Sequence, residues 1–309
     1  MLVRELAEGQ QIDQVLVVRE AARRSGEVVE LSLGDCSGAV RAHATADVAA
    51  EHCAVAGRAV RVSGRWEGGR LAVAALRPAA EHEYAPAELL DGPPRSVAGM
   101  EADLRELVGT VQHPALRALL EALLGPGAKT WPSYRDAPAA KRYHQAYKHG
   151  LLEHSLGVAQ AVSAISATFG GIDRDVAVTG ALLHDIGKLE AYTPADAMAI
   201  DMTDLGKLQG EIALGYYRIR RAIEDIPGFP EATAAAVLHI ILSHHGTLEH
   251  GSPVVPCTRE ATLVHMIDNL GGRLGSFDRL EKALPDGSQW SPFDRALAGA
   301  AWFGDRQAA

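Results

Sequence analysis

The spacing of the apolar residues changes once along this chain, from every second residue in the first 80 positions to a helical period beyond about Met100. Alternating apolar residues build strands with one buried face, whereas apolar residues three and four apart build amphipathic helices. A single change of period therefore predicts two structural units of different class. The stretch between them is polar and contains three prolines, so we predict a linker over 81–98.

The first unit, residues 1–80, contains five short strand patterns separated by turn residues. They lie at 15–18, 28–33, 40–44, 60–64 and 71–73. Five strands in so short a stretch suit a small closed barrel of the OB type. Trp66 is the only aromatic residue of this unit, and single strands are usually held by stacking on aromatic side chains. Binding of nucleic acid by the barrel and a role in packing or assembly therefore both stay open.

The second unit, residues 99–309, is predicted to be an all-helical bundle that begins with lead-in helices over 99–135. Further helices are expected at 150–168, from an Asp173 cap to Leu183, at 208–223, at 231–244 and at 259–270. A last short helix is expected after Pro292.

The composition limits the class of protein. A net charge of −9 argues against coating nucleic acid through bulk positive charge, but it allows an enzyme that draws a short strand into a local site. No apolar run reaches the roughly 20 residues of a membrane span, and the N-terminus lacks the apolar core of a signal peptide. Cys36, Cys53 and Cys257 show no CxxC spacing, which suggests a reducing compartment. We expect a cytoplasmic protein with no membrane partner.

The string His184-Asp185-Ile186-Gly187-Lys188 is the strongest chemical signal. Adjacent imidazole and carboxylate groups on a helix are splayed by about 100° and can still reach one cation. A buried carboxylate needs a partner, and a metal ion supplies one. Lys188 follows Asp185 by three residues on the same face, so it is either a phosphate contact or an ordinary solvated charge.

Other candidate ligands lie near the ends of other predicted helices. Imidazole and carboxylate ligands suit Mn, Fe, Co, Ni or Zn, and such a mixture is what a water-activating metal site requires. We interpret the remaining histidines of the apolar helical stretches as structural. The candidates are His154, His244, His245 and Asp268, and the histidines interpreted as structural are His113, His239, His250 and His265.

The order His154, His184-Asp185, Asp268 resembles the HD-domain phosphohydrolase superfamily. Several further stretches are similar to the YhaM type of 3′→5′ exoribonuclease, as is the order of a barrel ahead of a helical domain. These stretches are 138–141 (Pro-Ala-Ala-Lys), 144–147 (His-Gln-Ala-Tyr), 150–154 (Gly-Leu-Leu-Glu-His), 241–246 (Ile-Leu-Ser-His-His-Gly) and 267–270 (Ile-Asp-Asn-Leu).

The resemblance implies a metal-dependent 3′→5′ exonuclease that acts on single-stranded RNA or a short oligonucleotide, or on DNA, and releases nucleoside 5′-monophosphates. One or two divalent ions are implied, with Mn favoured and Fe, Co, Ni, Zn or Mg as alternatives. The expected ligands are His154, His184, Asp185, Glu211, His244, His245 and Asp268. The expected catalytic residues are Asp185, Lys188, His244 and His245, and the expected substrate contacts are His144, Tyr147 and Lys188.

Two positions depart from the family pattern. Gln145 and Glu211 stand where the family usually has histidine. Glu211 could serve as an oxygen ligand in place of nitrogen, which would favour a harder ion such as Mn. We expect it at the edge of an apolar helix face formed by Leu208, Ile212, Tyr216 and Ile219.

Two other functions compete with the exonuclease. The same chemistry could serve a phosphohydrolase of nucleotides or cyclic dinucleotides, which a barrel poor in aromatic residues favours modestly. A non-catalytic protein that binds nucleic acid or supports assembly on an eroded HD site is the third reading, motivated by Gln145 and Glu211. Self-association into a homo-oligomer is compatible with all three.

Overall fold

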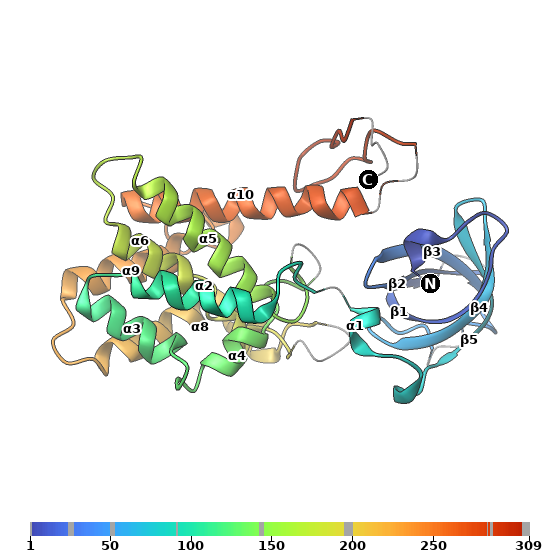
Figure 1. The fold of residues 1–309 in the computed structure, drawn as a ribbon, viewed down its shortest axis with the longest axis horizontal. Helices are drawn as coiled ribbons and strands as arrows, with labels where there is room; N and C mark the ends of the chain where they lie inside the picture. The colour runs from blue at the N-terminus through green and yellow to red at the C-terminus, as the bar shows by residue number, and fades with distance from the viewer. Residues whose placement is uncertain are drawn as a thin grey trace.

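The computed structural model describes residues 2–23, 28–49, 53–90, 92–141, 145–194, 200–282, 284 and 287–304. It consists of a closed five-stranded barrel and a helical domain, and α1 (Pro86–Leu89) lies at the junction (Figure 1). A long helix, α10 (Arg259–Lys282), extends from the helical domain towards the barrel. The predicted fold class, a small OB-like barrel followed by a helical region, is confirmed.

Every predicted strand of the barrel is present. The strands follow one another around the barrel in the order β1-β2-β3-β5-β4, and β4 pairs with β1 to close it. β3 and β5 pair in parallel, whereas all other neighbours are antiparallel. The strands are β1 (Gln11–Arg23), β2 (Val28–Asp35), β3 (Gly38–Thr45), β4 (Ala59–Glu67) and β5 (Arg70–Pro78).

The length of β1 explains how five strands close. Its first half pairs with β4 and its second half with β2, and the register shifts between Val18 and Glu20. A bulge of this kind bends a strand, so that one strand can serve two neighbours. The interior is filled by aliphatic side chains with no solvent exposure, including Leu16, Leu33 and Leu71.

The first half of the predicted linker packs on the barrel. Glu83, in the short helix η2 (Glu81–Glu83), forms ion pairs with Arg61 and Arg77. The guanidinium of Arg19 donates to the carbonyl oxygen of Leu89 over 3.1 Å, and Leu89 itself is buried. Only the stretch 90–96 therefore separates the barrel unit from the first helix of the helical domain, α2.

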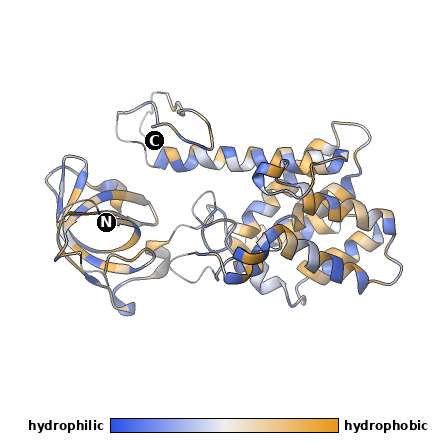
Figure 2. Cartoon of the chain, turned by 180° about the vertical axis from the view of Figure 1, so that it is seen from behind, coloured by the Kyte–Doolittle hydropathy of each residue, from blue (hydrophilic) through white to orange (hydrophobic). Residues whose placement is uncertain are grey.

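The helical domain has one continuous core in which α6 packs against α5 and α9, and all three helices pack against the first half of α10. Figure 2 shows hydrophobic residues concentrated in these packed helices. The helices are α2 (Val97–Gly109), α3 (Pro114–Leu124), α4 (Trp131–Asp136), α5 (Gly150–Ser166), α6 (Arg174–Leu183), α7 (Lys188–Ala191), α8 (Asp204–Glu224), α9 (Glu231–Ser243) and α10, with η1 (Val3–Glu5) and η3 (Leu248–His250) as short 3-10 turns.

Three details of the predicted helices are wrong. Gly210 interrupts α8 with a φ of 75°, and Leu208, just before this break, is 83% exposed rather than part of the apolar face. The helix predicted to end at Leu270 continues to Lys282. The helix predicted after Pro292 is absent from the described residues 287–304, which instead form an irregular segment with isolated bridges.

Two expectations from composition can be compared with the described residues. None of their helices combines the length and apolarity that crossing a membrane requires. All three cysteines are free thiols.

The close approach of α7 and α8 depends on Gly187. A Cβ atom at this position would overlap the carbonyl oxygen of Glu211 and lie 2.5 Å from the backbone nitrogen of Gly215. Both are backbone atoms, which cannot rotate away. Gly187→Ala is therefore expected to lower the free energy of unfolding by about 1–3 kcal/mol, measured by urea denaturation.

Gly157→Ala is the matched control, because Gly157 lies in α5 with open space around its Cα. This variant should match or exceed the wild type, by up to about 1 kcal/mol. Equal stability of both variants would show that Gly187 does not set the helix spacing.

Candidate metal centre

The imidazole and carboxylate side chains predicted as ligands converge where four helices of the core meet. α5 and α10 each contribute one residue from within the helix, whereas α6 and α9 each contribute two residues just beyond their last turn. The side chain of Asp173 accepts hydrogen bonds from two backbone N–H groups and so fixes where α6 begins. The converging residues are His154 (α5), His184 and Asp185 (after α6), His244 and His245 (after α9) and Asp268 (α10).

The first group of donors consists of His154, His184 and Asp268. The Nε2 atoms of the two histidines lie 3.2 Å apart, and the Oδ1 atom of Asp268 lies 3.1 Å from the first and 3.8 Å from the second. Ligand atoms bound to one ion at about 2.1 Å are separated by about 3–3.5 Å. The three residues are therefore spaced as ligands of a single cation.

The second group consists of Asp185, His244 and His245, whose donor atoms lie within 4.8 Å of one another. Asp185 also borders the first group, because its Oδ2 atom lies 3.4 Å from Nε2 of His154 and 3.3 Å from Nε2 of His184. Its Oδ1 atom lies 3.6 Å from Nε2 of His244. Oδ2 of Asp185 thus faces the first group of donors, and Oδ1 faces the histidines of the second group.

Three of the imidazoles are oriented by backbone carbonyl groups. Since a carbonyl oxygen only accepts, Nδ1 carries a hydrogen in each ring, and Nε2 is the nitrogen that a cation can bind. The Nδ1 atoms of His184, His244 and His245 lie 2.7, 2.8 and 2.9 Å from the carbonyl oxygens of Ala181, Ile241 and His250.

Two buried donor atoms of the centre have no hydrogen-bond partner among the described residues. They are Oδ1 of Asp185 and Nε2 of His244. Leaving such a group unsatisfied costs about 1–3 kcal/mol, and more for a charged one. A divalent ion would satisfy both at once, and the all-oxygen-and-nitrogen donor set suits such ions. The residues present therefore fit a metal.

The charged groups of the centre shift one another's pKa values. Burial by itself lowers the pKa of His184, but the carboxylates of Asp185 and Asp268 outweigh burial and raise this pKa to about 9. The pKa of each carboxyl group is raised by burial, yet the neighbouring cations hold it below its usual value. A metal ion that binds His184 at neutral pH must therefore displace a proton.

Lys188 is mostly buried and is not a solvated surface charge. Its Nζ atom lies 2.6 Å from Oδ2 of Asp185. Together with Tyr192 and Ser133 it lines a cavity of about 300 Å³, whose other walls come from α4 and the segments after α4 and α7. Lys188 therefore connects the donor groups to a space large enough for part of a nucleotide, and its predicted contact with phosphate stays a prediction.

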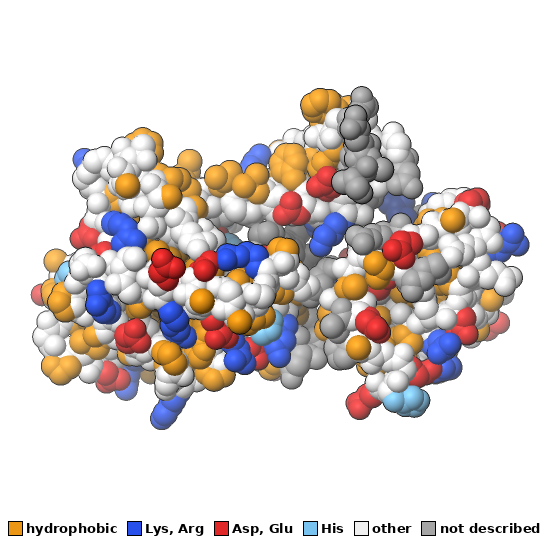
Figure 3. All heavy atoms as spheres, in the orientation of Figure 1, with side chains coloured by type: hydrophobic (Ala, Val, Ile, Leu, Met, Phe, Trp, Pro, Cys, Tyr) orange, Lys and Arg blue, Asp and Glu red, His pale blue; other side chains and the backbone are white. Residues whose placement is uncertain are grey.

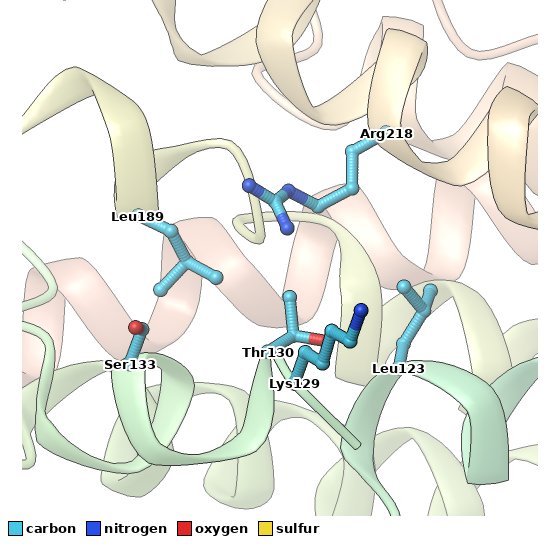
Figure 4. Close-up of a pocket in the computed structure, with 6 residues that line it drawn as sticks. All are labelled: Leu123, Lys129, Thr130, Ser133, Leu189 and Arg218. Carbon is cyan, nitrogen blue, oxygen red and sulfur yellow. The ribbon is translucent and has the colours of Figure 1, made fainter.

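A second cavity, of about 340 Å³, shares Ser133 and Leu189 with the first. Figure 4 shows Arg218 of α8 on one side of it and Lys129 and Thr130 on the other. Arg218 donates to a carboxylate oxygen of Glu190, 2.8 Å away, but the residues that line the cavity include two cations and no carboxylate. This space therefore favours an anion.

Glu211 lies directly after the break in α8. Its Oε1 atom is 3.6 Å from Nε2 of His245, at the more exposed side of the centre. Glu211 belongs to neither of the two groups of mutually close donors. It reaches the centre through His245, and its predicted role as a ligand stays a prediction.

The predicted substrate contacts are only partly described. His144 lies outside the described residues. The hydroxyl group of Tyr147 donates to Glu153 over 2.5 Å, which places Tyr147 beside the residue that precedes His154. Gln145 is buried in a left-handed conformation with a φ of 58°.

Sequence reasoning missed three residues that position the centre. Nδ1 of His265 lies 2.7 Å from the carbonyl oxygen of His244, and a side chain at Gly246 would overlap the His265 ring. The buried hydroxyl group of Tyr134 donates to the carbonyl oxygen of Leu182, just before His184. His265 precedes Asp268 by three residues, so the shared helix face was a usable signal.

Comparison with known proteins gives one family match. Residues 151–272 match the HD domain. A 3'-5' exoribonuclease YhaM from Geobacillus sp. (strain WCH70) is 32% identical over 200 residues, which cover 64% of this chain and 60% of the relative. The proteins of the same name from Bacillus velezensis and Bacillus subtilis are 28% and 27% identical, over 90% of this chain and 90% of each relative.

Removal of either residue of the central pair should remove bound metal. His184→Ala and Asp185→Ala are each expected to weaken the binding of a divalent ion by about 100-fold or more. Each substitution deletes a ligand atom that points toward the other ligand atoms of the centre. Metal content after dialysis, measured by mass spectrometry, checks this, with circular dichroism to verify the helical fold. His43→Ala, on an exposed barrel strand, is the control. Full metal content in either variant would place the metal elsewhere.

Proposed function

We propose that this chain, an HD-domain protein homologous to the YhaM-type exoribonucleases, is a metal-dependent 3′→5′ exonuclease that removes nucleotides from single-stranded RNA. The observation that carries the proposal is the carboxylate of Asp185, which faces two groups of donors with one oxygen left unpaired. Paired sites of this kind serve phosphodiester hydrolysis. The two relatives matched over 90% of their length are matched across both units of this chain.

His154, His184 and Asp268 would hold one ion and His244 and His245 a second, with Asp185 between them. When bound, such ions lower the pKa of water and neutralise charge on the phosphate. Nitrogen and oxygen donors with a carboxylate nearby favour Mn, with Fe, Co, Ni, Zn or Mg as alternatives.

Lys188 and His245, next to the donor groups, have different roles in the proposed reaction. Lys188, fixed by Asp185 and bordering the 300 Å³ cavity, supplies positive charge where the phosphate gains negative charge. Burial and the neighbouring His244 hold the pKa of His245 below its usual value. A neutral His245 serves better as a metal ligand than as a proton donor. We therefore assign the stabilisation of negative charge on the phosphate to Lys188.

The two adjoining cavities give the strand a path along the helical domain. Lys188 borders the first, and Lys129 and Arg218 border the second, so phosphates of successive nucleotides would meet cations along the way. The barrel offers less, because Trp66 is half-buried and packs on the barrel core. We therefore assign the main backbone contacts to the helical domain.

The two rival functions are not favoured. The relatives that match over 90% of their length are exoribonucleases by name, not phosphohydrolases of free nucleotides. An eroded, non-catalytic site is opposed by the complete set of converging donors.

The polarity of digestion is the direct test. With Mn present, the enzyme should shorten a 5′-labelled single-stranded RNA one nucleotide at a time and release nucleoside 5′-monophosphates, and a 3′-phosphate should slow it. His184→Ala should lower kcat by about 1,000-fold, while His43→Ala should match the wild type. Hydrolysis of free or cyclic nucleotides without shortening of the RNA would contradict the proposal.

Glu211 provides a second, independent test. Glu211→Ala should raise the Mn concentration needed for half-maximal rate by about tenfold, because the carboxylate beside His245 helps to hold an ion. Glu211→His should stay active but shift the best-supporting metal towards softer ions. Glu106→Ala, an exposed glutamate of α2, is the control. Unchanged metal titration for Glu211→Ala would remove this residue from the site.

A further inference from the structure

One face of α10 is apolar and largely exposed in the described chain. Met266, Leu270, Leu274 and Phe277 follow one another at intervals of three and four residues and therefore lie on one side of the helix. Between 37% and 59% of each side chain is exposed. Leu263 continues the same stripe into the bundle core, where it is partly buried. The stripe is therefore partly buried in the bundle at Leu263 and exposed to solvent from Met266 onward.

The C-terminal segment, residues 287–304, extends this apolar surface. Arg279 pairs with Asp294, and the rings of Phe277 and Phe303 lie 6.2 Å apart, so the segment packs alongside the stripe. Three of its four large aromatic side chains nevertheless face solvent. Trp290, Phe293 and Trp302 are between 60% and 71% exposed. Figure 3 shows hydrophobic side chains along α10 and on the top of the C-terminal segment.

The area of this surface exceeds what a monomer usually exposes. Seven large apolar side chains at these exposures present on the order of 700 Å². The largest apolar patch of a typical monomeric protein is about 300–600 Å². One partner in a standard protein interface buries about 800 Å², much of it apolar at the centre.

We infer that α10 and the C-terminal segment form an interface between two copies of this chain. A two-fold axis midway between Leu270 and Leu274 would set Leu270 of one copy against Leu274 of the other. The stripe is therefore complementary to itself in an antiparallel pairing.

The charges around the stripe favour protein over nucleic acid. α10 carries as many basic as acidic residues. A surface that takes an RNA strand needs an excess of positive charge for the phosphates, which α10 does not have. Two copies of a balanced helix, in contrast, can pair without net repulsion.

Measurement of mass against concentration tests the inference. In sedimentation experiments on the full chain, the wild type should be a dimer that dissociates only on strong dilution. Leu274→Glu should raise the dimer dissociation constant by about 100-fold or more, because it places a charge at the centre of the interface. Leu208→Glu is the matched control, since Leu208 is an isolated exposed leucine on α8, and it should remain dimeric.

Trp302→Ser, at the edge of the surface, serves as a second variant if Leu274→Glu does not fold, and it should weaken the dimer with the helical fold retained. A wild type that is monomeric at all concentrations would overturn the inference, as would a Leu274→Glu protein that dimerises like the wild type. Loss of RNA binding by Leu274→Glu at unchanged mass would assign this face to nucleic acid instead, and would also overturn it. None of these readings depends on whether the chain degrades RNA.

Discussion

The carboxylate of Asp185 is the group on which the arrangement of the helical domain depends. It is buried where the ends of α6 and α9 meet α5 and α10, and its two oxygens face different sets of imidazoles. A charge at such a position is tolerated only with compensating charge close by. Lys188 compensates one oxygen, whereas the other has no hydrogen-bond partner in the described chain. The packing of four helices around the Asp185 carboxylate therefore leaves one of its oxygens available to a cation.

The surroundings of this carboxylate are held by contacts that involve no ligand side chain. Gly187 lets α8 approach the turn after α6, and the hydroxyl group of Tyr134 holds the carbonyl oxygen of Leu182. His265 holds the carbonyl oxygen of His244 from the next helix. These contacts fix the backbone from which the ligands project, so the donors are placed before any ion arrives.

Local pattern predicted most of the fold and named the six residues whose donor atoms converge, together with Glu211, which lies in neither group. The alternating strands and the helices from Gly150 to Ser243 follow from apolar spacing, and the His184-Asp185 pair identified the centre. What the pattern missed depends on tertiary contacts or on one backbone angle. Gly210 breaks α8 without altering its apolar period, so the position of Leu208 could not be read from spacing.

The far half of α10 shows the same limit. Glycines at 271, 272 and 275 predict the end of a helix, yet the helix continues because Gly275, Ser276 and Leu280 are buried on the side opposite the exposed stripe. Pairing of distant segments, as between Arg279 and Asp294, leaves no periodic signal in the sequence. The position of Glu211 beside His245 likewise depends on the close packing of α7 and α8.

The ion pairs of Glu83 with Arg61 and Arg77 also shorten the connection between the barrel and the helical domain. Because the chain is fixed to the barrel as far as Leu89 and α2 begins at Val97, only the stretch 90–96 can act as a tether. Such a stretch spans at most about 25 Å when fully extended. A tether this short keeps anything bound to the barrel at an effective concentration in the millimolar range at the helical domain. If the chain trims RNA as proposed, even a weak hold by the barrel would keep the shortened strand near the metal centre between cuts.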